Sequence, residues 1–174
     1  VGTKLITAYD QPALGAVYKI VSMEDDKGVM HDTIKLSNNA EKVSTPGKKQ
    51  VWRITSRAKG KSEGDYITFA DTDVNALDEI NMFHPTYTYI NKTVRDFDAV
   101  PLLVPIYDKG QLIYDLPSLD EIKAYATKEL DELWNEYKRV LNPQDYPVDL
   151  AKDVWDNKMT LIDNVRKKAH NLPE

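Results

Sequence analysis

The residues best suited to binding a charged ligand form a basic segment around a tight turn. This segment has seven basic side chains and no acidic one, namely Lys42, Lys48, Lys49, Arg53, Arg57, Lys59 and Lys61. The dipeptide Pro46-Gly47 favours a type II turn, since proline fixes φ and glycine accepts a positive φ. Such a turn aims backbone N–H groups and flanking lysines at one point, which is typical of a phosphate or pyrophosphate site.

The same pattern has a second interpretation, a solvated lysine-rich hairpin that keeps the edge of a sheet from aggregating. The whole chain has a net charge of −5, so the segment is a local reversal of sign. This contrast suggests a polyanionic ligand. From the pattern alone, however, the solvated hairpin is the favoured interpretation.

The other residue types that commonly do chemistry form no obvious constellation. His31, His84 and His170 lack the spacing of metal ligands, and the absence of cysteine excludes disulfides and thiolate zinc sites. For His84, within Phe83-His84-Pro85, a structural role that orients a loop is favoured over catalysis. We therefore expect no metal site and no catalytic residue in this chain.

Composition sets the class of protein. The chain has 174 residues, of which 41% are hydrophobic and 29% charged, as expected for a folded soluble domain. No apolar run is long enough to cross a membrane. The net charge of −5 argues against general nucleic-acid binding, and the lack of cysteine fits a reducing cytoplasm.

Residues 16–116 are predicted to be rich in β-structure. One hairpin is expected to join 15–24 to 29–37, and a second to join 50–56 to 65–70. Residues 71–79 fit a short helix or a loop, and 86–90 have high strand propensity. Two prolines restrict 100–107 to an edge strand, which a turn at 108–110 leads into 111–114.

Residues 117–172 are predicted to form a pair of long amphipathic helices. Ser118 and Glu121 form a capping box, and apolar residues recur at helical spacing until Asn142-Pro143 ends the first helix. The second helix is expected over about Leu150–His170. Four aromatic residues are expected to pack between the two helices, namely Tyr125, Trp134, Tyr137 and Trp155. The predicted fold class is therefore α+β, mostly antiparallel hairpins followed by two helices, in a single unit.

Four segments resemble one family. They are Val1-Gly2-Thr3 through Gly15, the Lys42–Arg53 turn, Phe83-His84-Pro85, and Leu141-Asn142-Pro143 through Val148-Asp149-Leu150. Together they make the chain similar to the C-terminal part of a bacterial nicotinate phosphoribosyltransferase. Proteins of this family are much longer, so the chain is expected to begin inside a functional unit, with 1–15 as a phosphate-loop segment.

The resemblance implies an enzyme that forms nicotinate mononucleotide and pyrophosphate from nicotinate and phosphoribosyl pyrophosphate. ATP hydrolysis, with Mg²⁺, is coupled to this step of NAD salvage. The implied fold is an irregular α/β barrel beside a mixed sheet, usually in a cytoplasmic homodimer with the active site near the subunit interface.

The resemblance also assigns roles to residues. Gly2 and Thr3 fall on the loop expected to hold the 5′-phosphate, where a residue without Cβ allows close approach. The residues expected to face pyrophosphate or ATP phosphates, in this or the partner subunit's site, are Lys42, Lys48, Lys49 and Arg53. The family's phosphorylated histidine and nicotinate-clamping residues belong upstream of Val1, so the isolated chain is expected to be inactive. The alternative is a non-catalytic dimerisation or interaction module.

Overall fold

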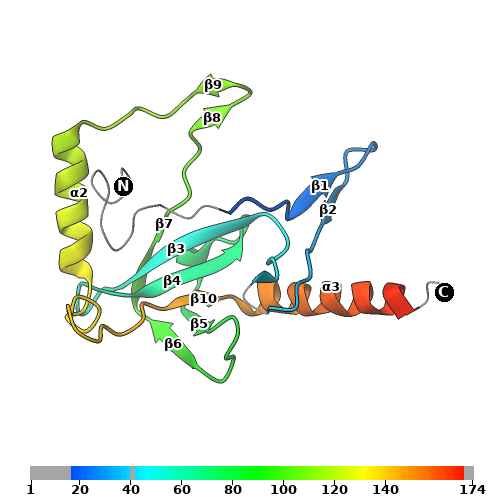
Figure 1. The fold of residues 1–174 in the computed structure, drawn as a ribbon. Helices are drawn as coiled ribbons and strands as arrows, with labels where there is room; N and C mark the ends of the chain where they lie inside the picture. Colours follow the sequence, from blue (N-terminus) through cyan, green and yellow to red (C-terminus); the bar gives the residue numbers. More distant parts are fainter. Residues whose placement is uncertain (1–16, 40–41, 171–174) are drawn as a thin grey trace, which may run out of the picture.

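The sheet at the centre of the chain has six strands in the order β6-β5-β10-β4-β3-β7 (Figure 1). The computed structural model describes residues 17–39 and 42–170. The sheet strands are β3 (Lys49–Ser56), β4 (Lys61–Phe69), β5 (Glu79–Phe83), β6 (Asn91–Arg95), β7 (Phe97–Pro101) and β10 (Val148–Leu150). Two antiparallel ribbons lie outside it, β1 (Ser22–Glu24) with β2 (Met30–Asp32), and β8 (Tyr107–Asp108) with β9 (Gln111–Leu112).

Two α-helices and one short 3₁₀ helix complete the described fold. They are α2 (Leu119–Glu132), α3 (Lys152–His170) and η2 (Val74–Ala76). This mixture of strands and helices makes the fold α+β, as the sequence predicted. Within the described residues, neither helix has the length and hydrophobicity needed to cross a membrane.

The long hairpin β3–β4 lies between strand β10 and the edge strand β7. Its strands pair antiparallel from Lys49 opposite Phe69 to Ser56 opposite Lys61, with an irregularity between Ile54 and Thr55. β3 also pairs with β7, which lies at the sheet's edge. An edge position suits β7, because its last residue, Pro101, has no N–H for a further neighbour.

Strand β10 corrects the sequence prediction, which placed Leu150 at the start of a helix. Residues Val148–Leu150 instead enter the sheet between two strands, parallel to β4 and antiparallel to β5. The Pro147 carbonyl accepts the Asp65 N–H at 2.9 Å, and the Ala151 N–H donates to the Ile67 carbonyl at 2.9 Å. The strand is held by its neighbours, and three residues are too few to show a period in sequence.

The core lies where β10 and the first turns of α3 meet the sheet. Ile54, Met82 and Val154 are completely buried, and Leu150 is almost so. Beside them, the rings of Phe83 and Trp155 meet edge to face, with centroids 6.3 Å apart. The start of α3 is thereby fixed against the end of β5.

The expected helical pair is wrong in two respects. Helix α2 ends at Glu132 and not at Leu141, because Leu133 adopts an extended conformation with ψ 146°. α2 and α3 also lie at opposite ends of the sheet (Figure 1), so no aromatic layer packs between them. Tyr137 instead packs edge to face on Tyr146, with centroids 5.4 Å apart. Tertiary contact overrides the helical period here.

Residues 86–90 form a loop between β5 and β6, although their composition favours a strand. The reason is His84, whose Nδ1 accepts the backbone N–H groups of Thr86 and Tyr87, each at 3.0 Å. Its ring also lies 5.0 Å from that of Tyr87. The predicted structural role of His84 is confirmed: it orients the loop.

Candidate functional site

The basic segment begins in a closely packed loop that leads into β3. Pro46 and Gly47 are buried, and Gly47 has a φ of 88°. A Cβ on Gly47 would lie 2.6 Å from Cε1 of Phe69, so only glycine fits this position. The Gly47 N–H donates to the Val21 carbonyl at 2.9 Å, which ties the turn to the segment before β1.

Lys49 holds this loop from inside. Its ammonium group donates to the carbonyls of Thr45 at 2.7 Å, Pro46 at 3.2 Å and Gly47. Burial lowers the pKa of Lys49, and the nearby Asp32 carboxylate opposes that shift. The ammonium group of Lys49 therefore uses its hydrogen-bond donors within the turn.

Arg53 is held between two carboxylates. Its Nε donates to Oδ1 of Asp65 on β4 at 3.0 Å, and its Nη1 contacts Glu129 of α2. Burial disfavours the charged guanidinium, but the hydrogen bonds and charges of these acids outweigh it and keep the pKa of Arg53 above its usual range. Arg53 thus fixes α2 against the sheet.

The remaining basic residues of the segment point to separate partners. Arg57 Nε donates to Asp98 at 2.8 Å, Lys59 lies 5.3 Å from the Trp134 ring centre, and Lys61 donates to the Asp131 carbonyl at 2.5 Å. Lys42 and Lys48 are exposed, and within the described ranges no hydrogen bond or ion pair involves either ammonium group. Gly2 and Thr3 lie outside the described residues.

A buried polar network beside Arg53 was missed by the sequence reasoning. The Tyr146 hydroxyl donates to Oδ1 of Asp65 at 3.0 Å and lies 2.6 Å from the Ser62 hydroxyl. Burial raises the pKa of Tyr146 to about 12, so the phenol stays protonated and donates. The partners are separated by some 80 residues, and no local pattern signals such a contact.

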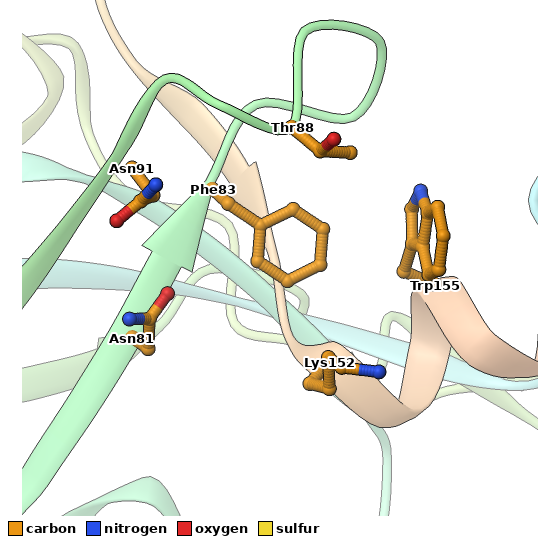
Figure 2. Close-up of a pocket in the computed structure, with 6 residues that line it drawn as sticks. All are labelled: Asn81, Phe83, Thr88, Asn91, Lys152 and Trp155. Carbon is orange, nitrogen blue, oxygen red and sulfur yellow. The ribbon is translucent and has the colours of Figure 1, made fainter.

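A small hollow opens at the end of β5, beside the start of α3 (Figure 2). It has a volume of about 340 Å³ and is lined by Asn81, Phe83, Thr88, Asn91, Lys152 and Trp155. The aromatic rings supply an apolar wall, and the two asparagines supply hydrogen-bonding groups. Lys152 is already paired with Asp156, at 2.5 Å and 2.7 Å from its two carboxylate oxygens.

A metal site in this chain would need acidic or histidine side chains close to one another. Among residues 17–39 and 42–170, no group of three or more such side chains is arranged to hold a metal ion. We therefore assign no residue in this part of the chain to Mg²⁺.

The mixed sheet and its tied basic turn belong to a known type of domain. Residues 48–158 match the family model described as nicotinate phosphoribosyltransferase C-terminal domain. The match spans more than half of the chain, which therefore belongs to this family.

Named relatives extend the match to nearly the whole chain. Nicotinate phosphoribosyltransferase of Bacillus subtilis (strain 168) is 52% identical over 168 residues, covering 97% of this chain and 34% of the relative. That of Homo sapiens is 32% identical over 152 residues, covering 87% of this chain and 27% of the relative. The chain thus spans between about a quarter and a third of the length of these relatives.

A solved structure agrees with the fold. The crystal structure of human nicotinic acid phosphoribosyltransferase superimposes with a TM-score of 0.61 at 28% identity. The match covers 68% of this chain and 24% of that one. The resemblance predicted from the four sequence segments is confirmed.

Proposed function

We propose that this chain is the C-terminal part of an enzyme that joins nicotinate to phosphoribosyl pyrophosphate. The products are nicotinate mononucleotide and pyrophosphate, with ATP hydrolysis coupled to the reaction, as a step of NAD salvage. The observation that carries the proposal is the 52% identity to the Bacillus subtilis enzyme along 97% of this chain. We further propose a cytoplasmic homodimer, in which the residues that react with nicotinate precede Val1.

The proposed roles of the basic residues divide in two. Lys42 and Lys48 are exposed, so they are proposed to contact pyrophosphate or ATP phosphates directly. Lys49 and Arg53 donate to partners within the chain, so their proposed part is to shape the surface that carries the other two. Gly2 and Thr3 are proposed to hold the 5′-phosphate.

The first prediction concerns Gly2. In the complete product of the gene, Gly2→Val is expected to raise KM for phosphoribosyl pyrophosphate strongly and to leave Tm nearly unchanged. A branched side chain would obstruct phosphate approach and disfavour a positive φ. Steady-state kinetics and a thermal melt measure the two effects. An unchanged KM with a lowered Tm would show that Gly2 serves only the backbone, and absence of turnover in the parent would contradict the proposed function.

The second prediction separates Lys48 from Lys49. Pyrophosphate is expected to raise Tm of the complete protein by mass action, and Lys48→Ala is expected to reduce this rise without destabilising the free protein. Lys49→Met is expected to cost about 1–3 kcal/mol of folding stability, because three carbonyls lose their donor. Melts at low and high salt test both effects, since salt screens the contribution of exposed Lys48. An undiminished rise in Lys48→Ala would favour the solvated hairpin.

One observation supports an interaction role alongside this function. Helix α2 has no buried residue, and its apolar side chains Leu119, Ile122, Tyr125 and Leu130 are about half exposed or more. Exposed apolar surface of this kind marks a contact with another part of a protein. We propose that the rest of the enzyme covers it. This makes the interaction module part of the enzyme and not an alternative to it.

A further inference from the structure

One face of α3 carries two cations among apolar side chains. Side chains three or four residues apart in a helix lie on one face, and this face consists of Trp155, Lys158, Met159, Ile162 and Arg166. These five residues line one side of a hollow of about 430 Å³. The hollow is different from the one in Figure 2, although Trp155 and Thr88 line both.

Lys158 is the unusual member of this face. The residue is only 9% exposed, and within residues 17–39 and 42–170 no hydrogen bond or ion pair reaches its ammonium group. The ammonium group itself keeps contact with solvent, because no fully buried side-chain nitrogen of these residues lacks a partner. Burial lowers the pKa of Lys158. A largely desolvated cation without a partner in the described residues attracts an anion that reaches it from solvent.

The rest of the lining is suited to such an anion. Arg166 supplies a second cation, and Ser37, Thr86 and Thr88 supply hydroxyl donors. The described lining contains no aspartate or glutamate that would repel an anion. The Trp155 ring is held by Phe83 and offers an apolar wall for a planar group.

We propose that this hollow binds a small aromatic molecule that carries a phosphate or carboxylate group. The oxyanion lies at Lys158 and Arg166, and the aromatic ring lies against Trp155. Neither Pro46 nor Gly47 lines this hollow, so it is an anion site distinct from that turn.

Thermal melts and isothermal titration on the complete product of the gene test the proposal at low salt. The probes are inorganic phosphate, adenosine monophosphate and benzoate. Inorganic phosphate has an oxyanion without a ring, whereas the other two have both. One or both aromatic probes are expected to raise Tm more than inorganic phosphate does. Lys158→Met keeps the aliphatic stem and removes the charge, so it is expected to weaken binding by roughly tenfold or more.

Two further variants serve as a control outside the hollow and as a second test of its lining. Lys167→Met removes the same charge from the same helix outside this hollow, so it is expected to bind the probes as the parent does. Arg166→Gln, at the exposed end of the lining, is expected to weaken binding without loss of fold. The proposal is overturned if no aromatic probe binds, if Lys158→Met binds like the parent, or if Lys167→Met loses as much affinity as Lys158→Met. These binding readouts do not depend on turnover.

Discussion

Arg53→Met is expected to lower the free energy of unfolding by about 3 kcal/mol, or roughly 6–12 °C in Tm. Arg53 is the cation between Asp65 and Glu129, whose side chains are 13% and 18% exposed. Methionine fills much of the same space but leaves both carboxylates without their partner in a partly buried position. Chemical denaturation of the variant and parent measures the difference.

A matched control is available on the loop that follows β3. Arg57 also pairs with two acids, Asp96 and Asp98, but all three side chains are more than half exposed. Arg57→Met is therefore expected to cost less than about 1 kcal/mol. Equal losses in the two variants would show that burial does not set the contribution of Arg53.

A double variant identifies the cause of the loss. Adding Asp65→Asn to Arg53→Met removes one of the two charges left unpaired, while the amide oxygen still accepts from the Tyr146 hydroxyl. The double variant is expected to be more stable than Arg53→Met by about 1 kcal/mol or more. A further loss in the double variant would contradict this account of the network.

The parts of the fold that were predictable are those coded by neighbouring residues. The alternation in β3 and β4 and the short turn between them indicate a hairpin, and the structure pairs these strands. The capping box is also local: the Ser118 side chain accepts from the Glu121 N–H, and the Glu121 carboxylate accepts from the Ser118 N–H. Each depends on contacts within about 20 residues.

The parts that were not predictable depend on distant contacts. Strand β10 has three residues, and its place in the sheet comes from β4 and β5, more than 60 residues earlier. The end of α2 is equally hidden, since apolar spacing continues past Glu132 while Tyr137 turns to meet Tyr146. Local propensity has no access to these partners.

The candidate site shows the same division. Sequence identified the basic segment and the glycine of its turn, and Gly47 has the positive φ that the turn requires. Sequence did not reveal that Arg53 is paired with carboxylates of β4 and α2. It also gave no sign that Lys158 lines a hollow, because its neighbours in space come from loops far away in the chain.

A chimeric enzyme is expected to show an activity that the chain alone is expected to lack. In the chimera, this chain replaces the matching last third of the Bacillus subtilis relative, to which it is 52% identical. If the chain is the C-terminal part of the same enzyme, its sheet and α2 provide surfaces that fit the remaining two thirds. The isolated chain is expected to form no mononucleotide, because the reacting residues are proposed to precede Val1.

The most direct measurement is the formation of nicotinate mononucleotide from nicotinate, phosphoribosyl pyrophosphate and ATP by the chimera, with the isolated chain and the Bacillus subtilis enzyme assayed beside it. The account predicts turnover by the chimera and by the Bacillus subtilis enzyme, and none by the isolated chain. A chimera that melts cooperatively but forms no mononucleotide, or an isolated chain that forms it, would contradict the account.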